Sequence, residues 1–305
     1  MNSSLPVLLK ADLPLPLFIR GKVRDTYDLG NHLLIIATDR ISAFDSVLPC
    51  GIPKKGQVLN QLSVFWFRHT ADLVPNHMVE AVDDVHCLDT YIPEENRFPY
   101  PSYLVGRSMV VQKVERIPVE CVVRGYLSGS AWEEYQQSGT ISGQSLPHHR
   151  LQESQELPEP LFTPTTKAET GHDLPITMDE IGKSLGNSQA EEIKKKSLTV
   201  YSHTRKYARE KGVIIADTKF EFGRNGDRLI LIDELLTPDS SRLWDAAQYK
   251  VGQSQPSYDK QPVRDWLVAA GWNKEPPAPI LPLEVIEATT QRYEQAYERL
   301  TGRKL

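Results

Sequence analysis

The sequence is short of several features that would assign it to a common class of protein. Its 305 residues contain only three cysteines, which are widely spaced and offer neither a disulfide framework nor a metal-binding pattern. A formal net charge of -5 argues against a nucleic-acid binder, whose surface is usually basic. Apolar runs such as residues 33–37 are far too short to cross a bilayer, and the N-terminus has no signal-peptide core. We therefore expect a cytoplasmic protein with no membrane or nucleic-acid partner.

The sequence also lacks the glycine-rich motifs that cradle phosphates, since neither G-x-x-x-x-G-K-[ST] nor G-x-G-x-x-G is present. Any nucleotide must then be held by cations on a β-hairpin. Residues 18–30 and 31–38 are typical of two strands joined at Gly30-Asn31, with Lys22 and Arg24 on one face. Such a basic strand face is weak evidence alone, because exposed basic strands are commoner than phosphate clamps.

The most informative stretch runs from Val213 to Trp244. Its first half alternates with period two, as in a strand with two different faces. The pattern assigns one face to Ile214, Ala216, Thr218, Phe220 and Phe222, and the other to Val213, Ile215, Asp217, Lys219 and Glu221. A hairpin signal at residues 224–227, a second run ending at Asp233 and a polar turn at residues 238–242 follow. Acids, a lysine and Arg242 thus meet at one end of a hairpin, as a magnesium–nucleotide site with an anionic substrate requires.

The register of this hairpin decides whether its acids share a face. A two-residue Asn225-Gly226 turn would put Glu221 and Asp233 on opposite faces, because a one-residue slip flips every side chain. A three-residue loop over residues 224–226 would set Asp217 opposite Asp233, with Glu221 on the same face. We predict the three-residue loop. The plainer alternative, which the pattern alone favours, is a half-exposed hairpin whose charged residues face water.

A second candidate site follows Arg124. Ser130 and Glu133 form a capping-box pattern that predicts a helix over residues 130–138, ended by Gly139. The glycines before this helix leave main-chain N–H groups open at its positive end, which favours an anion such as a phosphate. The alternative is an ordinary helix cap beside a surface arginine.

The remaining pattern predicts further elements and a division of the chain. We expect strands over residues 108–113 and 119–124, with Val114 to Pro118 connecting two lobes. Capping boxes at Thr177/Glu180 and Ser188/Glu191 begin helices, and other helices are expected over residues 57–70, 262–270 and 283–300. We divide the chain into an N-terminal lobe (1–112), a second lobe (113–250) and a C-terminal helical part (251–305), and expect the last to pack on the second lobe.

Four motifs in this order resemble one known family. They are Gly21-Lys-Val-Arg24, Pro118-Val-Glu-Cys-Val-Val-Arg124, Lys219-Phe-Glu-Phe-Gly223 and the run from Asp233 to Trp244. Together they look like SAICAR synthetase, the phosphoribosylaminoimidazole-succinocarboxamide synthase of purine biosynthesis. The resemblance covers almost the whole chain, and the long C-terminal part resembles the fungal type.

The resemblance implies a ligase that joins the carboxylate of carboxyaminoimidazole ribonucleotide (CAIR) to L-aspartate, with ATP cleaved to ADP and phosphate. It implies a mixed α/β, two-lobed fold related to ATP-grasp enzymes, with an antiparallel N-terminal sheet as a lid and C-terminal helices. ATP and Mg²⁺ are the implied cofactors, and a monomer or small homo-oligomer is expected. The rivals are a small-molecule kinase using the same Mg-ATP site, and a non-catalytic nucleotide-binding protein.

The resemblance also implies roles for individual residues. The lid cations Lys22 and Arg24 would hold the ATP phosphates, the main chain near Val114 the adenine, and Glu221 and Asp233 the Mg²⁺. The CAIR phosphate and its surroundings are expected at Arg124, Ser130, Asp239 and Arg242. Lys219 would act on the CAIR carboxylate, and Asp217 or Asp173 would orient or deprotonate the aspartate amine. Lys167, on a Gly-containing loop with Asp173, is expected to bind the aspartate carboxylates.

Overall fold

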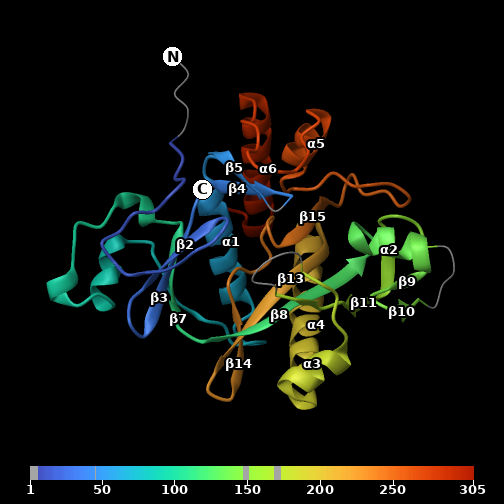
Figure 1. The fold of residues 1–305 in the computed structure, drawn as a ribbon, viewed down its shortest axis with the longest axis horizontal. Coiled ribbons are helices and arrows are strands. Elements are labelled where there is room, and N and C mark those ends of the chain that lie inside the picture. Colours follow the sequence, from blue (N-terminus) through green and yellow to red (C-terminus); the bar gives the residue numbers. More distant parts are fainter. Residues whose placement is uncertain (1–5, 45, 147–150, 168–172) are drawn as a thin grey trace.

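The computed structural model describes residues 6–44, 46–146, 151–167 and 173–305. Within them the chain is a mixed α and β protein whose two main sheets are antiparallel (Figure 1). This agrees with the fold class predicted from the sequence. None of the helices in these ranges is long and apolar enough to cross a membrane. All three cysteines are free thiols.

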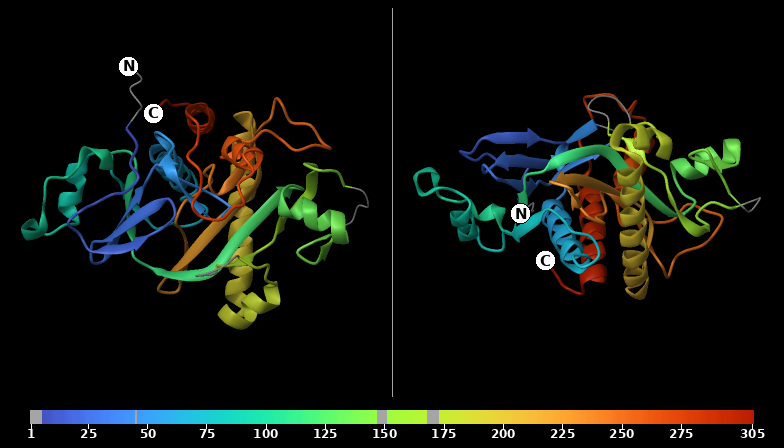
Figure 2. Two further views of the ribbon diagram at one scale, coloured as in Figure 1. Left: turned by 45° about the horizontal axis from the view of Figure 1, so that its top comes forward. Right: turned by 90° about the horizontal axis from the view of Figure 1, so that it is seen from below.

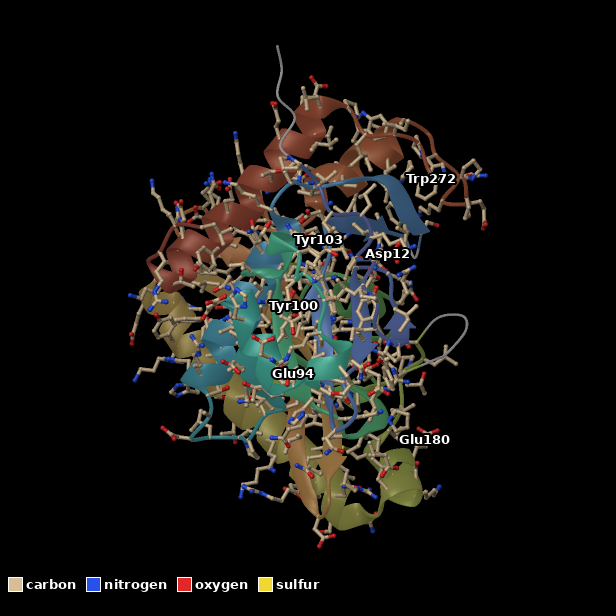
Figure 3. All side chains as sticks on the ribbon, turned by 90° about the vertical axis from the view of Figure 1, so that its left-hand side faces the viewer. Asp12, Glu94, Tyr100, Tyr103, Glu180 and Trp272 are labelled. Carbon is tan, nitrogen blue, oxygen red and sulfur yellow. The ribbon has the colours of Figure 1, made fainter. Side chains whose placement is uncertain are left out.

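The first sheet has five strands in the order β1-β2-β3-β7-β6. Its strands are β1 (Leu17–Arg20), β2 (Arg24–Asp28), β3 (His32–Ala37), β7 (Ser108–Gln112) and β6 (Met78–Ala81). Ile35 and Met109 belong to the face that packs on α1 (Lys55–His69). The opposite face is covered by a segment with the short 3-10 helices η1 (Val85–Thr90), η2 (Glu94–Asn96) and η3 (Ser102–Leu104). Figure 3 looks onto this segment, where Glu94, Tyr100 and Tyr103 are labelled.

The second sheet has six strands on the path β11-β8-β13-β14, with β12 beside β8 and β15 beside β13. Its strands are β8 (Glu115–Tyr126), β11 (Glu156–Phe162), β12 (Thr165–Thr166), β13 (Val213–Asn225), β14 (Arg228–Ile232) and β15 (Ser241–Asp245). The helix α4 (Asn187–Glu210), which follows the short α3 (Met178–Leu185), covers one face of this sheet. The other face carries the charged side chains of the candidate site.

The remaining elements are a hairpin of β4 (Arg40–Ala43) and β5 (Ser46–Gly51), a hairpin of β9 (Thr140–Ile141) and β10 (Gln144–Ser145), and the helices α2 (Ser130–Ser138), α5 (Gln261–Ala269) and α6 (Leu283–Thr301). The helices α1, α6 and α4 stand side by side in one layer (Figure 2). Tyr207 of α4 lies edge-on to Trp66 of α1, with ring centroids 5.5 Å apart. Its hydroxyl donates to the Leu300 carbonyl of α6 at 3.2 Å. One hydrophobic core therefore runs beneath both sheets.

The C-terminal helices pack more widely than expected. In α5, Val263 and Leu267 join Ile41 and Ile52 of the β4–β5 region in one apolar cluster. The helix α6 lies along α1 and adds Tyr293 to the main core. These helices therefore cover the N-terminal part as well as the second lobe. The division at residues 112 and 250 stays a prediction, since the core is continuous across both positions.

Helices were predictable where local end signals were strong. The helix over residues 130–138 is confirmed, and Gly139 ends it with a φ of 73°. The capping box of Thr177 and Glu180 is also confirmed. The predicted boxes at Ser130 and Ser188 are wrong, because α2 and α4 are capped by Gly129 and Gly186 without a side-chain hydrogen bond.

The lid hairpin and the connector also differ from expectation. The predicted strand over residues 18–30 is interrupted at residues 21–23, where the Gly21 N–H donates to the Arg24 carbonyl at 2.8 Å. Lys22 therefore lies in a turn between β1 and β2, and Arg24 begins β2. The connector between the sheets is shorter than predicted, because β8 begins at Glu115 and includes Pro118.

A buried ion pair joins α1 to the turn before β15. The Lys55 ammonium group is fully buried and donates to the Asp239 carboxylate at 2.7 Å. The Tyr293 hydroxyl of α6 donates to the same carboxylate at 2.5 Å. Burial alone would raise the pKa of Asp239, but Lys260 and Lys55 outweigh burial and lower it. Three segments far apart in the sequence thus meet at one ionised carboxylate.

We predict that Lys55→Met destabilises the protein by about 3–5 kcal/mol, because it leaves the buried Asp239 carboxylate without its nearest cation, at 2.7 Å, and with only Lys260, at 3.8 Å. Lys54→Met is a matched control, since the neighbouring Lys54 pairs with Glu294 at 2.6 Å but is partly exposed. That loss should be only ~0–1 kcal/mol. Urea unfolding measures both variants, and equal losses would contradict the importance of the buried pair.

Candidate active site

The candidate site lies on the charged face of the paired strands β8 and β13. Asp217 pairs with Arg124, and Glu221 pairs with Glu120, so side chains from both strands form one row. Lys219 lies between the two ends of this row. The predicted grouping of Asp217, Lys219 and Glu221 on one face follows from this pairing.

A β-bulge places these charged residues on the sheet face opposite to the one that the alternating pattern predicted. Ile215 pairs with Leu243, whereas Asp217 pairs with Arg242, so β13 has one extra residue, Ala216, against β15. Such an insertion reverses the alternation of side chains beyond it. Ile215 therefore points into the main core, while Asp217 points to the opposite face. The prediction that Val213 and Ile215 share the face of the charged residues is wrong.

The hairpin register is also different from both predicted registers. Glu221 pairs with Ile232 and Asn225 with Arg228, which leaves a two-residue loop, Gly226-Asp227. Gly226 has a φ of 59°, which suits the first central position of a type II′ turn. The predicted three-residue loop is wrong. The two-residue turn nevertheless does not put Glu221 and Asp233 on opposite faces. Asp233 lies beyond β14 and has a left-handed φ of 68°, so it leaves the strand alternation.

One end of the row is rich in acids. The Arg24 guanidinium contacts Asp233 and Glu234, each at 2.5 Å, and so joins the five-stranded first sheet to this end. Burial and the charge of Asp233 raise the pKa of Glu221, although Lys167 contacts Glu221 directly. Burial would raise the pKa of Asp233 too, but the charges of Arg24, Lys167 and Lys219 together outweigh burial and lower this pKa to about 2. Two carboxylates that repel each other are a suitable place for a cation.

These acids fit a magnesium ion only together with substrate oxygens. Among the described residues, no group of three or more His, Cys, Asp and Glu side chains is arranged to hold a metal. Mg²⁺ commonly takes just one or two protein carboxylates and completes its shell with phosphate oxygens and water. Glu221 and Asp233 match that requirement.

The other end of the row is rich in arginine. Arg124 donates to Asp217 at 3.2 Å, to Thr163 at 3.0 Å and to Ser130 at 3.3 Å. Arg242 donates to the same Asp217 oxygen. Two guanidinium groups and a serine hydroxyl thus meet at the N-terminus of α2, where main-chain N–H groups also favour an anion. Arg124, Ser130 and Arg242, which the resemblance grouped as phosphate ligands, are brought together.

A glycine makes this arrangement possible. A Cβ atom on Gly129 would lie 2.2 Å from Nη2 of Arg242, and Gly129 has a φ of 57°. The arginine end and the acid end are four residues apart along β13, or about 13 Å at strand geometry. A ribonucleotide with a phosphate at one end and a reacting carboxylate at the other can lie along this row.

Comparison with known proteins decides the family. A family model described as SAICAR synthetase matches residues 17–279. The chain belongs to the SAICAR synthetase family. A phosphoribosylaminoimidazole-succinocarboxamide synthase of Thermodesulfovibrio yellowstonii is 51% identical over 300 residues, covering 97% of this chain and 99% of the relative. A second, of Syntrophobacter fumaroxidans, is 50% identical over 307 residues, covering 100% of this chain and 99% of the relative.

Solved structures of the family agree with the fold. A SAICAR synthase of Saccharomyces cerevisiae in complex with SAICAR has a TM-score of 0.88 and 44% identity, covering 98% of this chain and 99% of that one. A SAICAR synthetase in complex with ADP has a TM-score of 0.66 and 25% identity, covering 94% and 98%. The long form with its C-terminal part, which resembles the fungal type, thus has bacterial relatives as well as a yeast one.

Other residues that the SAICAR synthetase resemblance implied lie around this row. Lys22 is exposed in the lid turn, and Val114 is half-buried against Gly223. Lys167 contacts Glu221 and lies 3.1 Å from Glu120. Asp173 is exposed, and residues 168–172 lie outside the described residues.

Sequence reasoning missed two acids of this SAICAR synthetase site. Glu120 contacts both Lys219, at 2.9 Å, and Lys167. Burial would lower the pKa of Lys219, but the charge of Glu120 raises it. Glu234 binds Arg24 and accepts from the Thr237 hydroxyl at 2.7 Å. Glu120 was detectable in principle, since it lies four residues before Arg124 and therefore on the same strand face.

We predict that Gly129→Ala weakens the binding of ribose 5-phosphate by at least tenfold, because the added Cβ displaces the Arg242 guanidinium. Gly139→Ala is the control at the other end of α2, where φ is also positive but no atom lies within 4 Å. It also places a side chain at a positive φ, in the milder left-handed conformation with a ψ of 8°, and it meets no collision. Isothermal titration calorimetry measures both, and equal affinities would contradict the phosphate site.

Proposed function

We propose that this chain joins the carboxylate of CAIR to the amino group of L-aspartate, with ATP cleaved to ADP and phosphate. Family membership over the full length supports the proposal, and the relative from yeast is described in complex with SAICAR. The observation that carries it is the row on β8 and β13, with an acid end beside the lid and an arginine end at α2.

The reaction needs positioning more than covalent help from the protein. A carboxylate is a poor electrophile at neutral pH, so an oxygen must first become a leaving group by phosphorylation. Phosphoryl transfer is accelerated mainly by alignment and by neutralising charge. A row that fixes the CAIR phosphate about 13 Å from the acid end supplies that alignment along one rigid strand.

ATP belongs at the acid end, beside the lid. Arg24 and Lys22 are proposed to contact its phosphates, and the main chain near Val114 its adenine. Glu221 and Asp233 are proposed to hold Mg²⁺, which neutralises phosphate charge when bound. Arg24 already spans from the lid to Asp233, which supports a lid that is positioned over this end.

The ribonucleotide belongs at the arginine end. Arg124, Arg242 and the Ser130 hydroxyl are proposed to bind its 5′-phosphate, since guanidinium groups match phosphate oxygens in pairs. Lys219 is proposed to hold the CAIR carboxylate as it is phosphorylated. Its contact with Glu120 keeps the ammonium group charged and aimed along the row.

For three residues, the observed contacts favour a role different from the one that the resemblance implied. Asp217 accepts from both arginines, which supports a positioning role rather than transfer of the amine proton. Lys167 lies between two acids, which favours a place near the ATP phosphates and the CAIR carboxylate. Asp239 is held by Lys55 and Tyr293, so we propose that it fixes the turn instead of binding substrate. Asp173 remains the proposed partner of the amine.

The proposal extends to the protein as a whole. The N-terminal lobe is the ATP lid, the second lobe carries the site, and the C-terminal helices support both. We also propose a cytoplasmic enzyme that acts on small molecules as a monomer or small homo-oligomer.

The test is ADP release by the purified protein with Mg-ATP and CAIR, with and without L-aspartate. Release that requires both substrates, with one SAICAR formed per ADP, is the expected result. A phosphorylated product from CAIR alone would establish the kinase alternative. No release under either condition contradicts both reactions.

We predict that Glu221→Gln and Asp233→Asn each reduce turnover at least as much as the roughly 10- to 100-fold losses caused by changing outer partners of metal ligands. CAIR binding should survive, because it depends on the arginine end. Asp227→Asn, at the exposed loop of the same hairpin, is the control and should leave turnover unchanged. Wild-type turnover in either site variant would dismiss the metal assignment.

We also predict that Arg242→Ala weakens CAIR binding by roughly 10- to 100-fold, the value of one charge-assisted hydrogen bond. The KM for ATP should change little, because ATP lies at the other end of the row. Steady-state kinetics with each substrate varied in turn measures both constants. Equal changes in the two KM values would argue against separate ends.

A further inference from the structure

A tyrosine behind the sheet contacts the main chain at the bulge. Tyr201 of α4 is fully buried, and its hydroxyl donates to the Ile215 carbonyl at 2.7 Å. Ile215 is the last residue of β13 before the extra residue, Ala216. Burial raises the pKa of Tyr201, so the hydroxyl keeps its proton and remains a donor.

The same hydroxyl also reaches the partner strand. A Cβ atom on Gly125 would lie 2.0 Å from the Tyr201 oxygen, so only glycine leaves room for it. Gly125 directly follows Arg124, and Arg124 pairs with Asp217 just after the bulge. Tyr201 therefore lies behind the place where the carboxylate and the first guanidinium of the arginine end meet.

We propose that Tyr201 is a positioning residue, whose hydroxyl fixes the bulge and thereby aims Asp217, and through it Arg124 and Arg242, at the substrate phosphate. Tyr201 touches no substrate, since it lies on the helix side of the sheet. The identity of the bound ribonucleotide rests on the proposed function, whereas the contact between Tyr201 and the bulge does not. This positioning role explains why the Tyr201 hydroxyl lies directly behind a glycine of β8.

The bulge matters because it sets the face of every charged residue that follows it on β13. A strand that lost the extra residue would turn Asp217 toward the core, since a one-residue slip reverses the side chains. Pairing with β8 holds the strand from Asp217 to Glu221. A weaker hydrogen bond at Ile215 should therefore loosen the arginine end and leave the acid end in place.

The first test is Tyr201→Phe, which removes the hydroxyl and keeps the ring. We expect the KM for CAIR and the Kd for ribose 5-phosphate to rise roughly three- to tenfold, the equivalent of one buried hydrogen bond. The KM for ATP should stay within about twofold of wild type. A general loss of folding would instead affect both substrates alike.

Tyr207→Phe is the matched control on the same helix. Its hydroxyl also donates to a main-chain carbonyl, but that carbonyl belongs to Leu300 of α6, and the ring packs on Trp66 of α1 instead of the β8–β13 sheet. Both variants should lose similar thermal stability, while only Tyr201→Phe changes the CAIR constants. Equal CAIR constants in the two variants would overturn the proposal.

Gly125→Ala provides a second test that does not depend on removing a group. The new methyl collides with the Tyr201 hydroxyl, so CAIR and ribose 5-phosphate binding should weaken as in Tyr201→Phe. The double variant should bind both ligands no more weakly than Gly125→Ala alone, because phenylalanine lacks the oxygen atom with which the new methyl group collides. Strictly additive losses would overturn the proposal.

The design also separates this inference from the proposed function. A wild-type chain without ligase activity would refute the function, and the ribose 5-phosphate constants of the variants would still decide the role of Tyr201. A wild-type chain that binds no ribose 5-phosphate would overturn the inference itself.

Discussion

A single carboxylate, that of Asp217, holds two guanidinium groups side by side, and the charged row depends on it. Two like charges about 4 Å apart repel by roughly 4 kcal/mol at the effective dielectric constant near a protein surface. The shared Asp217 oxygen offsets that repulsion for Arg124 and Arg242. The arginine end then keeps one net positive charge for a phosphate. At the acid end, the Glu221 and Asp233 carboxylates repel each other although Lys167 and Arg24 contact them, and this end therefore attracts a cation instead.

Two constraints that act at a distance set this geometry. The bulge at Ala216 carries no signal in the sequence, because an alanine in an alternating run looks like any other strand residue. The register of β14 is fixed partly by the segment before β6, since the Leu231 N–H donates to the Pro75 carbonyl at 2.9 Å. A local Asn-Gly signal at residues 225–226 therefore loses to tertiary pairing, and the loop moves to Gly226-Asp227.

Local chemistry, in contrast, could be read from the sequence. The end of α2 at Gly139 and the capping box at Thr177 follow from side-chain and backbone preferences within one turn, so both were predictable. Ser130 failed as a cap because it is already the first residue of α2, with Gly129 in the cap position, and its hydroxyl accepts from Arg124, a residue of another element. The site residues were found where the resemblance assigned them a role, whereas Glu234, although it lies within a motif, was passed over because nothing local reveals its contact with Arg24.

The C-terminal helix α6 helps to hold the turn before β15 in place. Asp239 is tied to Lys55 of α1 and to Tyr293 of α6, and it lies three residues before Arg242. In the same turn the Ser240 carbonyl accepts from the Lys219 N–H at 3.0 Å. A buried ion pair adds little net stability, because desolvation offsets its attraction. A conformation that breaks the pair, however, leaves a buried charge without a partner and is strongly destabilised. The pair therefore restricts the turn to one conformation, and the helices far from the substrate fix the positions of Lys219 and Arg242.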